Sequence, residues 1–330
     1  MAHELDMTTG QAAIAFRGAV PWHGLGESIL PDDSLEDIRI KAGLDYDVIK
    51  SPVMYECQPL GSEPQVATDP SSFVLHRSDT GDALSVVGSK YQVVQPSEVV
   101  EFYRDLVADY GFQIEVVGAL RGGRKIWALA NTNEAFNLDP DDKMKGYLLL
   151  ATSYDSSMAT QARFTSVRVV CNNTLSMARA EGKANVTVPH STKFVASQVK
   201  LDLNIGPTWS EFQYQTQKLA RASVDADKSV NLLLQAYFDL KAEDVADFAR
   251  NDDNAKRLEK LVERTWKISQ AAPGARTDSA YGTLWGLVNT VTYDIDHTAR
   301  RSPDVKLDRA WFGQGERIKQ RIMQLALEAA

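Results

Sequence analysis

The sequence has few of the residues on which disulfide frameworks and metal sites depend. Its 330 residues include two cysteines, Cys57 and Cys171, and five histidines scattered along the chain. Two cysteines are too few for a disulfide framework or a cysteine-based zinc site, and this usage is typical of a reducing compartment. Cys171 has no histidine near it in the sequence, so we interpret it as the buried end of a strand rather than a nucleophile.

Long apolar runs are also missing. Runs such as YLLLA, at Tyr147–Ala151, are far shorter than the roughly 20 residues that a membrane-spanning helix needs. The opening MAHELDMTTG has no basic segment followed by an apolar one, so we expect no signal peptide. We therefore expect a cytoplasmic protein with no membrane partner.

The sequence lacks the common catalytic signatures. It contains no G-x-x-x-x-G-K-[ST] phosphate loop, no G-x-S-x-G nucleophile elbow and no H-E-x-x-H zinc helix. We predict no cofactor and no catalytic residue, and we favour a binding protein over an enzyme without excluding an activity.

What the chain does have is an ordinary globular composition with an uneven charge. Hydrophobic residues make up 44% and charged residues 24%, which supports a sizeable core. The net charge is −8, but residues 1–120 carry 7 Lys and Arg against 19 Asp and Glu, and residues 121–200 carry 11 against 6. A basic stretch in an acidic chain either lines a groove for a polyanion or is a chance cluster.

The first half of the chain reads as short strands with a few helices. The entry segment around Trp22 and His23 is either a partner loop or an arm anchored by the tryptophan. Ser34 predicts a helix N-terminus. Residues 46–94 predict antiparallel strands, with the stretch 61–72 as a surface loop, and a helix follows from Pro96 to Gly111.

The basic stretch from Arg121 to Lys183 predicts a sheet followed by a helix. RGGR separates two strand-like runs, which is a strong hairpin signal. Residues 133–145 are expected to form an acidic loop before two more strands. Asn172 or Asn173 then predicts the start of a helix that ends at Gly182.

From Ser197 onward the pattern is helical, with APGART as a linker between two helices. We therefore predict an α+β fold, an antiparallel sheet of short strands with packed helices, followed by a mostly helical C-terminal region. The expected domains are residues 1–200 and residues 201–330.

The basic stretch supplies the candidate binding residues. Basic side chains that follow a phosphate backbone and aromatic rings that stack on bases are what binding of a single strand requires. The alternative is that Phe164 and Trp127 face the core and the arginines form a solvated edge. The predicted nucleic-acid-binding residues are Arg121, Arg124, Lys125, Tyr154, Arg163, Phe164 and Arg168.

A weaker candidate lies in YDIDHTAR, near the end of the chain. Asp294, Asp296 and His297 are metal-ligand types, and Asp294 and His297 are spaced to share one face of a helix. The alternative is a helix surface, or an ion-paired cluster with Arg300 and Arg301.

Several stretches resemble a known family. They include PWHGLGESI, SVVGSKYQVVQPSE, RGGRKIWALA, SYDSSMATQARFTSVRVVCNNTLSMA and GTLWGLVNTVTYDIDHTAR. The chain resembles the phage/plasmid-like protein family, a domain of unknown function common on bacteriophages and mobile elements. In the order of its elements it is also remotely similar to single-strand annealing proteins, which bind single-stranded DNA as rings or filaments without ATP.

We therefore expect a phage or prophage accessory protein that binds single-stranded nucleic acid and anneals complementary strands as a homo-oligomer. One alternative is a non-catalytic protein that modulates a host or phage protein through its acidic N-terminal part. A third interpretation is a metal-dependent enzyme that acts on nucleic acid through Asp294, Asp296 and His297.

Overall fold

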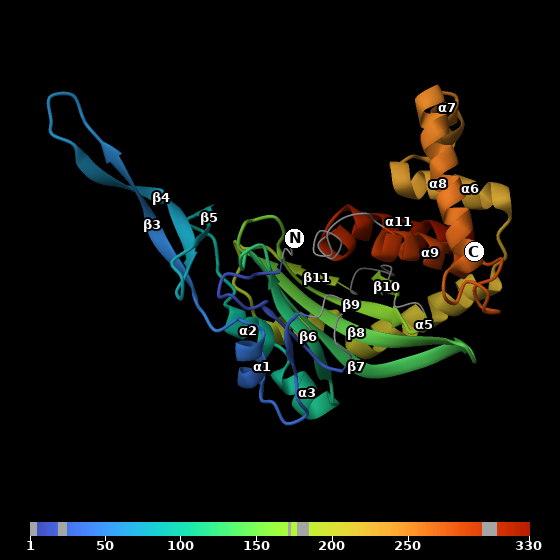
Figure 1. The fold of residues 1–330 in the computed structure, drawn as a ribbon, viewed down its shortest axis with the longest axis horizontal. Helices are drawn as coiled ribbons and strands as arrows, with labels where there is room; N and C mark the ends of the chain where they lie inside the picture. The colour runs from blue at the N-terminus through green and yellow to red at the C-terminus, as the bar shows by residue number, and fades with distance from the viewer. Residues whose placement is uncertain (1–4, 19–24, 171–172, 177–184, 299–308) are drawn as a thin grey trace. The chain divides into compact units, whose positions relative to one another are not determined.

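A computed structural model describes residues 5–18, 25–170, 173–176, 185–298 and 309–330 (Figure 1). The predicted segment around Trp22 and His23, and Cys171, lie outside these ranges. The chain divides into two compact units. The first comprises Met1–Thr132, Leu148–Arg163 and Asn185–Asp202, and the second comprises Asn133–Tyr147, Phe164–Ala184 and Leu203–Ala330. The second unit thus combines Leu203–Ala330 with two earlier segments that the sequence prediction placed in the domain of residues 1–200.

The larger sheet has eight strands among the described residues and confirms the predicted mixed α+β class. The strands follow the order β10-β9-β8-β7-β6-β1-β2, and β11 also pairs with β9. Their bounds are β1 Ile14–Phe16, β2 Glu27–Ser28, β6 Gln113–Leu120, β7 Lys125–Asp139, β8 Asp142–Ser153, β9 Thr160–Arg168, β10 Asn173–Ser176 and β11 Asn185–Val188. The strands β7, β8 and β9 each begin in one unit and end in the other.

The predicted RGGR hairpin is confirmed between β6 and β7. Leu120 pairs with Lys125, and the turn between them uses left-handed backbone at Arg121, Gly122 and Gly123. Gly123 also permits a close approach, because a Cβ there would lie 2.7 Å from the Tyr46 hydroxyl. Glycine is favoured at such positions because it has no side chain to clash.

Short helices cover this part of the first unit. Helix α1, Leu35–Lys41, starts with the predicted Ser34 cap, and Asp37 completes a capping box. The predicted helix from Pro96 is present as two pieces, α2 Pro96–Glu101 and α3 Arg104–Tyr110, and Gly111 ends it in the left-handed conformation. Helix α4, Ala196–Leu203, begins the helical part of the chain.

A second sheet of three strands confirms the predicted meander. Its order is β3-β4-β5, with bounds Val48–Cys57, Gln65–Arg77 and Ala83–Gly88. The predicted surface loop at residues 61–72 is wrong over most of its length, because Gln65–Ser72 extend β4. They pair with β3 across a register shift between Pro52 and Val53.

The second unit is mainly helical. Its principal helices are α5 Ile205–Arg221, α6 Ala226–Phe238, α7 Val245–Ala249, α8 Asp252–Ala271, α9 Leu284–Tyr293 and α11 Gln314–Ala329. A π-helical turn, Asp294–Thr298, continues α9. The β7–β8 hairpin belongs to this unit at its tip, where Phe136 packs against Trp209 and Phe212 of α5. No helix in the described part of the chain is long and apolar enough to span a bilayer.

Two other sequence predictions are wrong. Residues 133–145, expected as an acidic loop, instead continue β7 and β8 around a short turn at Pro140 and Asp141. The predicted helix from Asn173 begins as strand β10, because its backbone pairs with β9 from Arg168 to Thr165. Pairing with a neighbouring strand overrides a local helix signal of this kind. The rest of that predicted helix lies outside the described residues.

We predict that Tyr103→Phe destabilises the first unit. The Tyr103 side chain is fully buried, and its hydroxyl donates a proton shared between the carbonyls of Ala128 on β7, at 2.8 Å, and Leu148 on β8, at 3.0 Å. Losing this bond should lower the free energy of unfolding by about 1 kcal/mol in urea titrations. Tyr110→Phe removes an exposed hydroxyl and should leave the midpoint unchanged. Equal effects of the two variants would contradict this role.

Candidate functional site

The structure separates the predicted nucleic-acid-binding residues into exposed and buried ones. Arg121 and Arg124 are exposed at the β6–β7 turn. The Arg124 guanidinium donates to the carbonyl oxygens of Leu84 and Ala83 at the start of β5, so much of its hydrogen-bonding capacity is used within the first unit. Lys125 and Arg163 are buried in strands β7 and β9.

The two aromatic residues predicted to stack on bases are core residues. Tyr154 is fully buried, and its hydroxyl donates to the carbonyl of Val94 at 2.8 Å. Burial raises the pKa of Tyr154 well above its usual value, which keeps this donor protonated. Phe164 is also buried. Neither ring presents a face to solvent, so this structure does not offer them for stacking. Phe164 and Trp127 lie in the core as the alternative expects, but Arg163 and Arg168 are buried and do not form a solvated edge.

Arg168 is buried because it forms an ion pair with Asp142. Its Nε and a terminal nitrogen donate to the two carboxylate oxygens of Asp142 at 2.6 and 2.8 Å. Asp142 also accepts from the Ser279 hydroxyl and from the indole nitrogen of Trp285 at 3.1 Å. A bidentate pair with further donors is the arrangement that makes a buried carboxylate tolerable. Arg168 is therefore a structural residue of the second unit rather than a phosphate contact.

The same arginine fastens the segment between α8 and α9. Its guanidinium donates to the carbonyl of Gly274 at 2.9 Å and to the hydroxyl of Thr277 at 3.0 Å. In the same segment the Ser279 backbone amide donates to Asp139 at 2.8 Å. Burial raises the pKa of Asp139, but the hydrogen bonds from Ser279 outweigh it and hold that pKa below its ordinary value.

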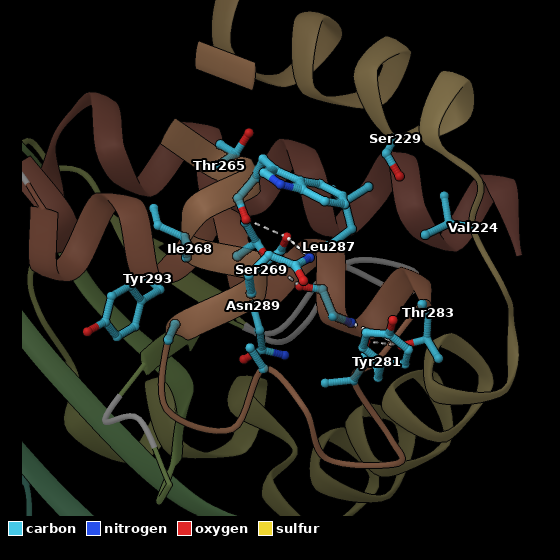
Figure 2. Close-up of a pocket in the computed structure, with 18 of the residues that line it drawn as sticks. Val224, Ser229, Thr265, Ile268, Ser269, Tyr281, Thr283, Leu287, Asn289 and Tyr293 are labelled. Carbon is cyan, nitrogen blue, oxygen red and sulfur yellow. Dashed lines mark hydrogen bonds between the residues drawn. The ribbon is translucent and has the colours of Figure 1, made fainter. Parts of the chain in front are cut away.

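A cavity of about 370 Å³ lies behind this segment (Figure 2). Its lining comes from α6, α8 and α9 and from the connection between α8 and α9. Figure 2 shows Ile268 and Tyr293 at one end of the lining and Val224, Ser229 and Tyr281 toward the other. The volume lies near the lower end of the roughly 300–1,000 Å³ typical of small-molecule sites.

Close backbone approaches shape this cavity. A Cβ on Gly286, at the start of α9, would lie 1.9 Å from the carbonyl oxygen of Ala280. Gly274 has a φ of +72°, and a Cβ there would lie 2.4 Å from the Val170 side chain. Any larger residue at Gly286 would push the connecting segment away from α9, so both glycines fix the wall of the cavity.

The lining has two charged side chains, Arg168 and Asp225, and both are engaged within the protein. The exposed Asp225 carboxylate accepts from the Lys228 backbone amide at 2.8 Å at the start of α6. The charge of Arg168 is balanced by Asp142. The hydroxyls of Thr265 and Thr290 donate to carbonyls one turn earlier in their own helices, at 2.9 Å in each case. Polar groups that are already paired leave a cavity that favours an uncharged, mainly apolar group over a phosphate.

Two exposed aromatic side chains border the cavity. Trp266 of α8 is 64% exposed and Tyr281 is 59% exposed, although both line it. The guanidinium of Arg276 lies 4.6 Å from the centre of the Tyr281 ring and also donates to Gln270. An exposed aromatic pair with a cation beside it offers stacking surfaces and a positive charge at the entrance.

The predicted metal ligands are engaged in ion pairs. Asp294 accepts from Arg264 at 2.8 Å and from the Tyr237 hydroxyl at 2.7 Å. Asp296 accepts from the buried Lys319 at 3.0 Å. Both acids are therefore in ion pairs, with Arg264 and Lys319. The predicted cluster with Arg300 and Arg301 lies outside the described residues. Among the described residues, no three His, Cys, Asp or Glu side chains gather as a metal site would require.

The sequence prediction missed the cavity entirely. Its aromatic border comes from Trp266 and Tyr281, which the sequence prediction placed in two helices without assigning them a binding role. A usable signal was the pair of glycines in and after APGART, Gly274 and Gly286, because glycine beside a helix start indicates a close backbone approach.

We predict that Asp142→Asn destabilises the second unit. The change leaves the Arg168 guanidinium buried without a countercharge and should lower the free energy of unfolding by about 3 kcal/mol or more. Asp141→Asn is the matched control, since Asp141 is exposed at the neighbouring turn position and should shift stability by less than about 0.5 kcal/mol. Urea unfolding followed by circular dichroism measures both. Similar losses for the two variants would mean that the pair does not hold this unit together.

Comparison with known proteins gives a family without a described activity. No curated protein matches the chain, and no solved structure matches it. The family described as a domain of unknown function, DUF932, matches residues 83–311. This range contains the β6–β7 hairpin, the Asp142–Arg168 pair and most of the cavity lining. The chain therefore belongs to the DUF932 family.

Proposed function

We propose that the protein binds single-stranded nucleic acid and that the cavity of the second unit holds an unstacked base. The observation that carries the proposal is the mainly apolar cavity bordered by the exposed rings of Trp266 and Tyr281. Proteins that bind single strands hold bases on aromatic side chains, and each such stack contributes about 1–3 kcal/mol. In this proposal the base stacks at the border of the cavity and not on Tyr154 or Phe164, which the sequence analysis predicted for stacking.

The charge distribution supports a base in the cavity with its phosphate outside. Arg168, the cation in the lining, is neutralised by Asp142. Arg276 stands at the border on the Tyr281 ring, where it can reach a phosphate while the base stacks. With so few cations at the entrance, binding should depend only moderately on salt.

The resemblance to the phage/plasmid-like protein family supports a role on phage or plasmid DNA. Annealing of complementary strands, the finer expectation, would need the strand to be held with its bases exposed along most of its length. A cavity that holds one base is sufficient for the chain to bind a single strand. Annealing would then require several copies of the chain along that strand. The carboxylates of Asp294 and Asp296 form ion pairs with the side chains of Arg264 and Lys319. The metal-dependent alternative therefore gains no support from their geometry.

We predict that Trp266→Ala and Tyr281→Ala each weaken binding of a fluorescein-labelled oligothymidylate by about 5- to 100-fold, because each removes a stacking surface. Fluorescence polarisation at two salt concentrations measures the affinity and its salt dependence. Arg276→Ala should reduce the slope of log affinity against log salt by about 0.7, the value for one phosphate on a single strand.

Two controls make this test decisive. Tyr110→Ala removes a ring that is 69% exposed on α3 and should bind as the unaltered protein does. Arg121→Ala tests the β6–β7 turn, where one of the sequence-predicted cations is exposed. Loss of binding in Arg121→Ala but not in Trp266→Ala would overturn the cavity as the site. Absence of binding by the unaltered protein at low salt would overturn the proposed function itself.

A further inference from the structure

The distal part of the β3–β4 hairpin is an exposed two-stranded ribbon. We define the ribbon as Val53–Cys57 of β3 and Gln65–Asp69 of β4, with the turn that joins them. None of the residues 51–74 is buried. Figure 1 shows β3 and β4 running out together to this turn. An isolated two-stranded hairpin is marginally stable in water, so a ribbon with neither face covered is suited to contact a partner.

Apolar side chains are exposed on both faces of the ribbon. Tyr55 pairs with Ala67, and Met54 pairs with Thr68, on opposite faces of the two strands. Met54 is 65% and Val66 59% exposed, and Leu60 in the turn is fully exposed. Exposed apolar side chains that cluster on one element mark an interaction site more often than scattered ones do.

One backbone edge of the ribbon is open. Strand β5 pairs with β4 only from Ser72 to His76. Within the described residues, the edge of Gln65–Asp69 that faces away from β3 therefore has no neighbouring strand. Unpaired backbone groups on a strand edge can accept an added strand from a partner. The outer edge of β3 is less suitable, because Pro52 lacks an N–H group.

The negative charge of the ribbon favours a basic partner. From Ser51 to Leu75 the sequence contains the carboxylates Glu56, Glu63 and Asp69 and no Lys or Arg. Two copies of the ribbon would bring like charges together, and a nucleic acid would be repelled. A basic protein strand complements both the carboxylates and the apolar side chains.

We propose that this ribbon is a docking arm for a partner protein, which adds a strand of alternating basic and apolar residues to the open edge of β4. The apolar side chains would pack on the face that carries Val66 and Met54, and the basic ones would lie on the opposite face, beside Asp69 of β4. This arm lies in the first unit, so its binding is separate from the nucleic-acid binding proposed for the second.

The test uses the full chain and a fluorescein-labelled peptide of alternating lysine and valine, with an alternating glutamate–valine peptide as the charge control. We expect the lysine peptide to bind and the glutamate peptide not to bind. Asp69→Asn should weaken binding of the lysine peptide about two-fold, because one ion pair at the strand edge is lost. Glu56→Gln, on the face of Val66, is the matched control and should leave the affinity unchanged.

A matched pair of valines tests the apolar contact. Val66→Thr should weaken binding of the lysine peptide. Val86→Thr on β5, where the valine is 63% exposed, should leave that binding unchanged. Both changes keep a β-branched side chain, so the strands should persist. No binding of the lysine peptide, equal effects of the two threonine variants, or a dimer in sedimentation that Val66→Thr dissociates would each overturn the proposal.

Discussion

The second unit depends on one buried charge pair. Asp142 comes from the turn end of the β7–β8 hairpin and Arg168 from the end of β9, and together they hold the segment that connects α8 to α9. A buried carboxylate is tolerated only when its lone pairs are filled, and this one accepts from Arg168, Ser279 and Trp285. The pair fixes the cavity wall and also neutralises Arg168, the cation in its lining. Arg168, which the sequence analysis predicted as a phosphate contact, is therefore unavailable to phosphate. It shapes the site through its pair with Asp142 instead.

The two proposed binding features differ in chemistry as well as in place. The cavity is mainly apolar, lined by packed helices and bordered by aromatic rings, which suits a flat base. The β3–β4 ribbon is acidic and apolar with an open strand edge, which suits a basic protein segment. The strongly acidic character of residues 1–120 therefore does not conflict with nucleic-acid binding elsewhere in the chain. In the first unit it favours a partner of opposite charge.

Local signals in the sequence predicted much of the fold but little of the site. The RGGR turn, the Ser34 cap and the C-terminal helical periods act over a few residues, and the structure contains all of them. Strand β10 and the extension of β4 depend on pairing with a distant segment, which no local pattern reveals. The prediction of the binding residues failed for the same reason. In the sequence, a basic residue on a strand has the same pattern whether it faces solvent or a buried acid. Arg168 contacts Asp142 only after strands β8 and β9 have paired.

The cavity as a base-binding site is the central claim, and photo-crosslinking tests it most directly. An oligonucleotide that carries 5-iodouracil is irradiated with the protein, and the linked residues are mapped by mass spectrometry. The account predicts crosslinks at Trp266 or Tyr281, the exposed rings that border the cavity. Crosslinks confined to the first unit, for example beside Arg121, would contradict it.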